Sequence, residues 1–292
     1  MKIKMLYADI KSDIEIIENE LEQALNSSSH LLNDASIHLL QAGGKRIRPV
    51  FTLLSAKFGD YNIERMKNIA VPLELIHMGS LVHDDVIDDS DMRRGRETVK
   101  AQWNNRVAMY TGNFIFARAL EYVTSIENPR AHQILAKTMV ELVNGEVIQI
   151  EDKFRLDQNL KDYFRRIKRK TALLIESSCE LGAVVSGADE KTVRHLKRYG
   201  YFVGMSFQIV DDILDFTATD KQLGKPAGSD LMQGNITLPI LLMKDNPLLA
   251  PYLAKVSTTG LSEQERQNML ALVRNSDAIK EAIKISNLYL KK

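Results

Sequence analysis

Carboxylates gather at the end of an apolar stretch in "LELIHMGSLVHDDVIDDSDMRRG", residues 73–95. Asp84 and Asp88 have i, i+4 spacing, so on a helix they lie about 40° apart in azimuth and roughly 6 Å apart in rise. Asp85 lies about 100° around from Asp84, so the three converge only at the edge of that face. Neighbouring carboxylates repel one another, and oxygen-only ligands suit Mg²⁺ or Ca²⁺ rather than zinc. The cluster therefore predicts a site for a divalent cation.

The same Asp-Asp-x-x-Asp spacing returns in "FQIVDDILDF", as Asp211, Asp212 and Asp215. A single acidic pentad is also typical of a solvated helix face. Two pentads, each ending an apolar helix and 127 residues apart (211 − 84), favour a functional interpretation. We expect them to lie in opposed halves of one helix bundle and to face a shared cavity.

A basic loop, "GGKRIRP", presents Lys45, Arg46 and Arg48 after two glycines and before Pro49, which is expected to begin a helix. Flexible backbone amides, a helix N-terminus and three cations predict an anion cradle. The Walker spacing G-x-x-x-x-G-K-[ST] is absent, and a solvated basic turn is the alternative. His77 lies two turns before the first acidic cluster on the same face, so it is expected to contact a ligand, although a core histidine is the alternative.

The elements that hold these residues are predicted to be helical throughout, because apolar residues recur with a spacing of three to four. No stretch alternates as a strand with convincing turns, and no linker divides the chain. The prediction is one all-α domain, an antiparallel helix bundle around a deep central cavity. The expected helices cover 4–27, 33–41 with a cap at Asn33 or Asp34, 62–89 with Pro72 inside it, 99–110, 111–125, 128–152, 157–182, 188–216, 236–244, 262–275 and 277–291.

Composition excludes several classes of function. The formal charge of +1 gives no reason to expect nucleic acid, and a hydrophobic fraction of 45% fits a globular core. The single Cys179 lies in an apolar stretch, so we expect a core residue in a reducing compartment. No apolar run reaches the roughly 18 residues of a transmembrane segment, and the N-terminus lacks the apolar block of a signal peptide. The expected location is the cytoplasm.

Two carboxylate triplets with basic groups around them suit a diphosphate ligand held through Mg²⁺, with Lys and Arg neutralising the remaining charge. The sequence shows no Ser/His/Asp or Cys/His nucleophile set. The expected chemistry is therefore electrophilic: a diphosphate departs and leaves a cation, while the protein positions the reactants and stabilises the departing charge.

Five motifs resemble, in order and spacing, the trans-isoprenyl diphosphate synthases over about residues 35–242: "GGKRIRP", "HDDVIDDSDMRRG", "RKTALLI", "GMSFQIVDDILDF" and "LGKPAGSDLMQGNITLP". The resemblance implies an all-α fold with the site in a deep cavity. It also implies head-to-tail condensation of isopentenyl diphosphate onto an allylic diphosphate, here expected to be farnesyl diphosphate. Ionisation of the allylic substrate comes first, attack by the isopentenyl double bond second, and loss of a proton to the released diphosphate third.

Within that family the chain is most similar to the catalytic component II of the bacterial heptaprenyl or hexaprenyl diphosphate synthases, which make quinone side chains. The resemblance implies a heterodimer with a small regulatory subunit, and a homodimer is the alternative. The chain ends at "NLYLKK", short of the C-terminal helices that this likeness leads us to expect. A class I terpene cyclase and a non-catalytic partner subunit are rival interpretations. The second full Asp triplet and the basic loop argue against the first, and intact motifs argue against the second.

The same resemblance implies a role for individual residues. The expected Mg²⁺ ligands are Asp84, Asp85, Asp88, Asp211, Asp212 and Asp215. The residues expected to hold the allylic diphosphate are Arg93, Lys170, Thr171, Gln208 and Lys225. Those expected to hold isopentenyl diphosphate are Lys45, Arg48, His77 and Arg94. Among them, the catalytic set is Asp84, Asp85, Asp88, Arg93, Lys170, Asp211 and Lys225.

Product length is predicted from the helix that leads to the first acidic cluster. An allylic tail running back along it meets Gly79 and Ser80 about one turn down, Ile76 at two turns and Leu73 at three. A large aromatic at the first turn would close a tunnel after a few isoprene units, so Gly79 and Ser80 predict a long product. The alternative is that both small residues only permit close helix packing.

Overall fold

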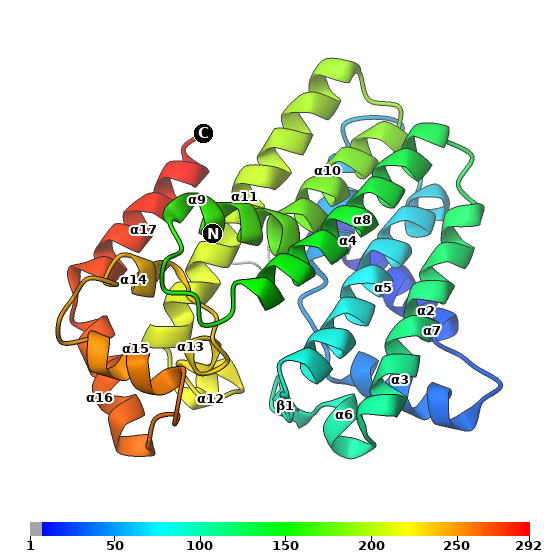
Figure 1. Ribbon diagram of the computed structural model, residues 1–292. Helices are drawn as coiled ribbons and strands as arrows, with labels where there is room; N and C mark the ends of the chain where they lie inside the picture. Colours follow the sequence, from blue (N-terminus) through cyan, green and yellow to red (C-terminus); the bar gives the residue numbers. More distant parts are fainter. Residues whose placement is uncertain (1–7) are drawn as a thin grey trace. The chain divides into compact units, whose positions relative to one another are not determined.

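The computed structural model describes residues 8–292 and consists almost wholly of helices (Figure 1), which confirms the predicted all-α class. Two compact units are distinguished. The first comprises Met1–Met139 and Leu174–Gly200, and the second comprises Val140–Leu173 and Tyr201–Lys292. The start of the helix expected at 4–27 lies outside the described residues.

The first unit is built on helices that follow one another closely in sequence. They are η1 (Ala8–Ile10), α2 (Lys11–Ala24), α3 (His30–Gln41), α4 (Ile47–Ala56), α5 (Ile63–Ile87), α6 (Val99–Gln102), α7 (Asn105–Thr124) and most of α10 (Leu173–Val185). Helices α8 (Pro129–Glu151) and α11 (Glu190–Thr217) give their first parts to this unit and their later parts to the second.

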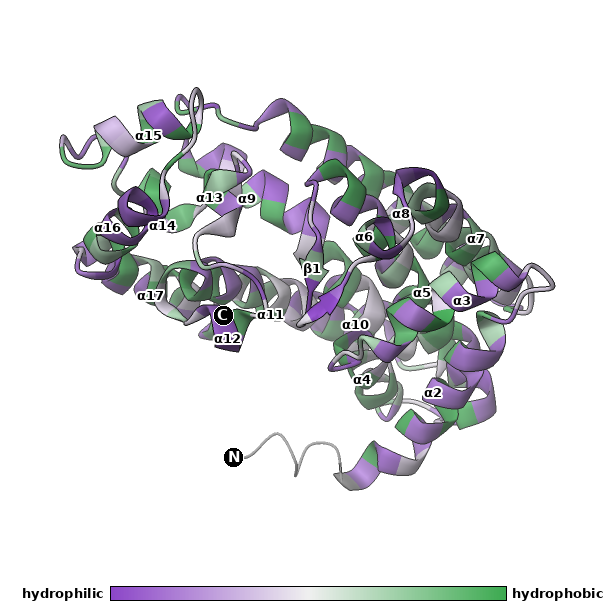
Figure 2. Ribbon diagram, turned by 90° about the horizontal axis from the view of Figure 1, so that it is seen from below, coloured by the Kyte–Doolittle hydropathy of each residue, from purple (hydrophilic) through white to green (hydrophobic). Residues whose placement is uncertain are grey.

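Helix α5 is the central element of the first unit and carries the first acidic cluster at its end. The side chain of Asn62 caps its start by accepting from the Arg65 N–H, and Pro72 lies within the continuous helix. Helices α2, α4 and α7 pack against α5. Helix α2 is amphipathic, as the alternating colours of Figure 2 show, and it buries Ile17 and Leu21 completely. This packing fixes the helix whose last turn presents the carboxylates.

A two-residue hairpin follows α5, where no strand was predicted. Strands β1 (Met92–Arg93) and β2 (Arg96–Glu97) pair antiparallel, with Arg93 opposite Arg96. The connecting residues Arg94 and Gly95 have φ of 53° and 76°. Two positive φ angles in a two-residue loop are the signature of a type I′ turn, a position that favours Asn or Gly. Arg94 therefore has a backbone conformation that an arginine rarely adopts. Residues with such conformations cluster at functional sites.

Three expected boundaries in the chain are wrong. The second helix begins at His30 because Ser29 caps it, accepting from the Leu32 N–H at 3.5 Å, and not at Asn33 or Asp34. The helix expected at 99–110 is broken after four residues, and Asn104 caps α7 afresh. The helix expected at 157–182 is three segments: α9 (Leu160–Ile167), a π-helical segment η2 (Lys168–Ala172) and α10. Capping side chains and a local change of helix type therefore override the apolar periodicity.

The second unit contains the end of α8, α9, η2, the end of α11 and six further helices. These are α12 (Asp220–Leu223), α13 (Ser229–Met232), α14 (Leu238–Leu241), α15 (Ala250–Val256), α16 (Glu263–Arg274) and α17 (Asp277–Leu290). Its core includes the fully buried Tyr163, Phe216 and Leu231. Helix α16 starts with a capping box in which Ser262 and Glu265 bond each other's backbone N–H. Helix α15 was not predicted.

Two expectations about the chain's chemistry are tested by the fold. Cys179 is fully buried in α10, which confirms the expected core residue, and burial raises the pKa of its thiol to about 12. Across residues 8–292, no helix combines the length and apolar composition needed to cross a bilayer.

Candidate active site

The first acidic motif ends helix α5 and lies in the first unit. Asp84 and Asp85 are buried, and Asp88 is the C-terminal cap of the helix. The guanidinium of Arg93, on β1, donates from Nε and Nη2 to the same oxygen of Asp85, at 2.8 and 2.7 Å. Burial raises the pKa of Asp85, and the cation of Arg93 limits that rise. The family resemblance implies separate roles for Asp85 and Arg93, and the structure joins them in an ion pair.

The basic loop and the hairpin turn bring several arginines together. A Cβ added to Gly44 would lie 2.9 Å from Nη1 of Arg94 and 3.1 Å from Nη1 of Arg46. The backbone of Gly44 therefore leaves room for two guanidinium groups. Burial first, and then the nearby cations of Arg48 and Arg94, lower the pKa of His77 well below its ordinary value. His77 is therefore a neutral imidazole beside positive charge.

We name the set Gly44, Arg46, Arg48, His77 and Arg94 the arginine cradle. Three of the four residues expected to hold isopentenyl diphosphate, namely Arg48, His77 and Arg94, belong to it. Burial, together with the charge of Arg94, lowers the pKa of Arg48 to about 10, so its guanidinium stays cationic at neutral pH. The fourth residue, Lys45, is exposed beside the cradle. The structure thus brings together a group of cations suited to a phosphate-bearing ligand.

The second acidic motif is on α11, in the second unit, and its three carboxylates differ in environment. Asp211 is exposed, whereas Asp212 is 2% exposed. The hydroxyl of Tyr163 donates to Asp212 at 2.6 Å, and Nε2 of Gln208 donates to its other oxygen at 2.7 Å. Thr171 in turn donates to Gln208 Oε1 at 2.6 Å. Burial raises the pKa of Asp212 to about 8, against the effect of these donors.

This chain of hydrogen bonds joins Thr171, Gln208 and Asp212, which the sequence nominated separately. Tyr163, on α9, is the member that sequence reasoning missed. It is fully buried, and its partner is 49 residues away in sequence. A lone tyrosine in an amphipathic helix carries no signal of such a bond, so only the fold reveals it.

Asp215, the last member of the motif, connects α11 to the glycine-rich loop that follows. It accepts from the Ser229 hydroxyl and the Asp230 N–H, both at 3.3 Å. Lys225 lies 3.3 Å from Asp215 and 2.7 Å from Asp230. Burial lowers the pKa of Lys225, but Asp230 and Asp215 outweigh it, so the net shift is upward. The contacts hold Lys225 charged and in place against the motif.

Lys170 and Thr171 lie in the π-helical segment η2, which is a helix type found often at functional sites. The Lys170 ammonium donates to Glu146 of α8 at 3.1 Å. The two segments approach closely because residue 145 is glycine: a Cβ there would lie 2.8 Å from the Cβ of Arg169. The ion pair fixes the direction of Lys170 within the second unit.

The residues expected to set product length divide into two kinds. Leu73 and Ile76 are fully buried in the core of the first unit. Gly79 packs against α7, where an added Cβ would lie 3.2 Å from the ring of Phe116 and 3.3 Å from the carbonyl oxygen of Gly112. Ser80 is half-buried, and its hydroxyl donates to the carbonyl of His77 at 2.9 Å. These contacts favour the packing alternative for Gly79, and the role expected for Ser80 in product length stays a prediction.

The carboxylate oxygens of both motifs fit a hard divalent cation by their chemistry. Among the described residues, no three His, Cys, Asp or Glu side chains form a ready metal site. Mg²⁺ commonly binds through one or two carboxylates and completes its shell with water and substrate phosphates. The donor set fits a metal that arrives with a diphosphate.

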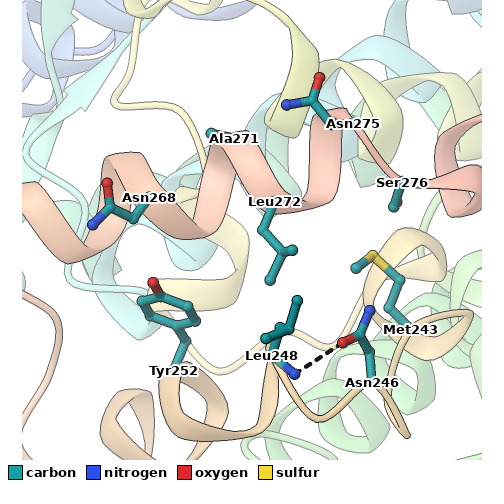
Figure 3. Close-up of a pocket in the computed structure, with 9 residues that line it drawn as sticks. All are labelled: Met243, Asn246, Leu248, Tyr252, Asn268, Ala271, Leu272, Asn275 and Ser276. Carbon is teal, nitrogen blue, oxygen red and sulfur yellow. Dashed lines mark hydrogen bonds between the residues drawn. The ribbon is translucent and has the colours of Figure 1, made fainter.

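A pocket of about 530 Å³ lies in the second unit, between the α14–α15 connection and α16. Leu272 points toward Leu248 and Tyr252 across it (Figure 3), and asparagines contribute polar groups at its wall. None of the predicted site residues lines it. Its mixed, open lining does not correspond to the expected prenyl-transfer site.

Comparison with known proteins identifies the family. Residues 29–268 match the family described as Polyprenyl synthetase. The chain is 54% identical over 292 residues to heptaprenyl diphosphate synthase component 2 of Bacillus subtilis, covering 100% of this chain and 84% of that protein.

Solved structures show the same relationship. Heptaprenyl diphosphate synthase from Staphylococcus aureus matches with a TM-score of 0.90 and 46% identity, over 97% of this chain and 89% of that one. A polyprenyl synthase from Caulobacter crescentus, complexed with calcium and isoprenyl diphosphate, matches with a TM-score of 0.94 and 30% identity, over 99% and 89%. Taken with the two acidic motifs and the arginine cradle, these findings show that the chain belongs to the polyprenyl synthetase family and is a trans-prenyltransferase.

Proposed function

We propose that the protein condenses isopentenyl diphosphate onto an allylic diphosphate, with farnesyl diphosphate as the starter, to make heptaprenyl or hexaprenyl diphosphate for quinone side chains. The observation that carries the proposal is that one chain holds two acidic motifs and a separate arginine cradle. Two acidic motifs suit a metal-bound allylic diphosphate, and the cradle suits a second diphosphate. The likeness of the whole chain to a heptaprenyl diphosphate synthase component supports the product class.

Mg²⁺ is the proposed cofactor, and the carboxylates of the two acidic motifs are its proposed ligands: Asp84, Asp85, Asp88, Asp211, Asp212 and Asp215. When bound, the metal neutralises charge on the allylic diphosphate as it leaves. The calcium in the Caulobacter crescentus complex supports a divalent cation in that relative. In the present chain, Asp85 already pairs with Arg93, and Asp215 with Lys225, so these two carboxylates also position cations.

The chain's other residues contribute position and charge. Arg93, Lys170 and Lys225 are proposed to hold the allylic diphosphate and to stabilise the negative charge that grows on it as the C–O bond breaks. Arg48 and Arg94 are proposed to hold the isopentenyl diphosphate so that its double bond attacks the allylic carbon. The attack leaves a cation on the isopentenyl unit, and the carbon next to it loses a proton to the released diphosphate, which forms the new double bond. Neutral His77 can donate one hydrogen bond to the isopentenyl diphosphate without adding a charge.

The name "component 2" in the Bacillus subtilis relative implies that that protein works with another component. We propose that the present chain likewise pairs with a small regulatory subunit in the cytoplasm, as one all-helical domain. A homodimer is the alternative arrangement. Assay of the chain alone and with the small subunit separates the two, because a homodimer needs no second component for activity.

The test of the proposed function is direct. The protein is incubated with farnesyl diphosphate, isopentenyl diphosphate and Mg²⁺, with and without the small subunit, and the products are sized by chromatography. We expect metal-dependent elongation to seven or six isoprene units, and we expect Asp84→Ala or Asp211→Ala to lower the rate by about 100-fold or more. A rate that survives either substitution nearly unchanged would exclude the proposed role of the acidic motifs.

A further inference from the structure

Among the arginines of the cradle in the described residues, Arg46 is the one whose guanidinium bonds to two carboxylates of the protein. Its Nε and Nη2 donate to the two oxygens of Glu18 at 2.6 and 3.1 Å. Its Nη1 donates to Glu74 Oε1 at 3.3 Å. Glu18 is on α2 and Glu74 on α5, so one side chain joins the basic loop to both helices. We call these three residues the Arg46 clamp.

The clamp holds an unfavourable backbone. Arg46 has φ of 46° at the position that precedes α4, which is the left-handed region that residues with a Cβ rarely adopt. Its side chain is 5% exposed. A bidentate guanidinium–carboxylate pair has fixed planar geometry, so it constrains the orientation of the residue that carries it. The pair with Glu18 can therefore maintain the left-handed turn against its preference.

The backbone conformation of Arg46 determines where the side chain of Arg48 begins. Arg48 follows Arg46 by two residues, in the first turn of α4. Its Nε is buried without a hydrogen-bond partner in the described part of the chain, as is Oε2 of Glu74. A buried, unpartnered donor is costly, and an incoming phosphate oxygen would satisfy it. Two carboxylates of the protein thus neutralise the charge of Arg46, whereas Arg48 keeps a buried Nε without a hydrogen-bond partner among the described residues.

We propose that Arg46 is a positioning residue for isopentenyl diphosphate: through Glu18 and Glu74 it fixes the basic loop so that Arg48 meets the diphosphate, and it does not contact that substrate itself. The inference rests on the proposed function. It goes further by assigning different roles to two arginines of one motif: Arg48 binds the substrate, and Arg46 positions Arg48. The allylic diphosphate should be unaffected, because its proposed ligands are other residues.

The principal test is Arg46→Met, which keeps the length of the side chain and removes its charge and its donors. In the complete enzyme, with the small subunit if it is required, we expect the KM for isopentenyl diphosphate to rise about tenfold or more. The KM for farnesyl diphosphate and the Mg²⁺ dependence should stay within about twofold of the wild type. Arg46→Lys should give an intermediate KM, since a lysine keeps the charge but cannot form the bidentate pair.

A matched control is available on the same two helices. Lys67 of α5 forms ion pairs at 2.7 Å with Glu20 of α2 and at 2.8 Å with Glu64. Lys67→Met therefore removes a comparable link between α5 and α2, but it lies outside the basic loop. It should lower the melting temperature as Arg46→Met does and leave both KM values unchanged. A selective change in one KM separates positioning from general loss of stability.

A double-mutant cycle tests the route. Glu18→Gln should raise the same KM, and it should add little in the Arg46→Met background, because both substitutions break one pair. The proposal is overturned if Arg46→Met is folded and leaves the KM for isopentenyl diphosphate within about twofold, or if both KM values rise together. It is also overturned if the two substitutions act additively. Wild-type protein that forms no elongated product at all would instead refute the proposed function, so the two failures are distinguishable.

Discussion

Arg93 directs two of its nitrogens, Nε and Nη2, at a single oxygen of Asp85, at 2.8 and 2.7 Å. Three aspartates of the same motif therefore have different surroundings, and they should differ in function. Asp85 is engaged by a cation of the protein itself, so it can act by holding Arg93. Asp84 and Asp88 share the face of α5 that is suited to a metal.

The first prediction compares Asp84→Asn with Asp85→Asn. Asp84→Asn should raise the Mg²⁺ concentration that gives half-maximal rate, by about tenfold or more, because a metal ligand is lost. Asp85→Asn should mainly raise the KM for the allylic substrate, because a charge-assisted bond worth about 1.5–3 kcal/mol no longer holds Arg93. Metal titrations and substrate titrations of both variants check this. Equal changes in both parameters for both variants would show that the aspartates act alike.

The second prediction concerns Tyr163, whose hydroxyl donates to buried Asp212. Tyr163→Phe leaves a buried carboxyl oxygen without its donor, which should lower the free energy of unfolding by about 1–3 kcal/mol. Urea denaturation measures it. Tyr252→Phe is the control in the same unit, because Tyr252 lines the open pocket and should change stability by less than about 0.5 kcal/mol. Equal losses in both variants would contradict a specific role for the Tyr163 bond.

The comparison of sequence with structure is instructive at the second motif. Helical periodicity sufficed to predict α11, the Asp-Asp-x-x-Asp spacing indicated Asp212, and the family resemblance indicated Thr171 and Gln208. Tyr163 could not be found, because hydrogen bonds between distant helices depend on how side chains meet after folding. Local spacing constrains only neighbours about one turn apart.

The basic loop shows a second limit. Arg46 and Arg48 are the same residue type, two positions apart, and neither their type nor their spacing separates them; only the family resemblance selects Arg48, and it assigns no role to Arg46. Their roles diverge because Arg46 adopts a left-handed φ and meets Glu18 and Glu74. The hairpin that places Arg94 was missed for a related reason, since strands of two residues are too short to show a period.

The third prediction separates a product tunnel from helix packing. Ser80→Phe should shorten the product by several isoprene units if the allylic tail passes Ser80. Gly79→Ala places a Cβ 3.2 Å from the Phe116 ring and 3.3 Å from the Gly112 carbonyl oxygen, so crowding should offset the gain of about 0.5–1 kcal/mol that alanine usually brings inside a helix, and the variant should leave product length unchanged. Product sizing and thermal unfolding of both variants distinguish the effects. An unchanged product length in Ser80→Phe would remove the tunnel argument.

The fourth prediction concerns metal and diphosphate. Because Mg²⁺ commonly binds through one or two carboxylates and completes its shell with substrate phosphates, Mg²⁺ alone should stabilise the protein weakly. Mg²⁺ with inorganic diphosphate should raise the melting temperature by several degrees, since a ligand at 100 times its Kd adds about 2.7 kcal/mol. EDTA should reverse the increase, and Asp84→Asn should reduce it. A full increase with Mg²⁺ alone would show that the protein forms the metal site unaided.

The fifth prediction is a pH dependence caused by His77. Burial and the cations of Arg48, Arg94, Arg93 and Arg46 lower its pKa in the folded state. Above about pH 6.5 both folded and unfolded states carry neutral histidine, so this stability is fully present there. As the pH falls, only the unfolded state gains the proton, and stability falls by up to about 1.4 kcal/mol per pH unit.

His77→Gln should remove that contribution and flatten the profile. Urea denaturation of wild type and variant at about pH 5, 6 and 7 measures the difference, in which the other histidines cancel. The wild type should lose more stability than the variant between about pH 7 and 5. Parallel profiles would mean that His77 takes up its proton in the folded state as readily as in the unfolded chain.

The π-helical segment η2 has a consequence for reading related sequences. A π turn accommodates one residue more than an α turn, and a single residue corresponds to a rotation of about 100° around the helix. The five residues Lys168–Ala172 thus set the phase between α9, which carries Tyr163, and α10. In a homologue with one residue fewer in this segment, the lysine and threonine would face another direction, although every residue of the motif would be retained. Alignment in this stretch therefore has to follow the helix phase as well as residue identity.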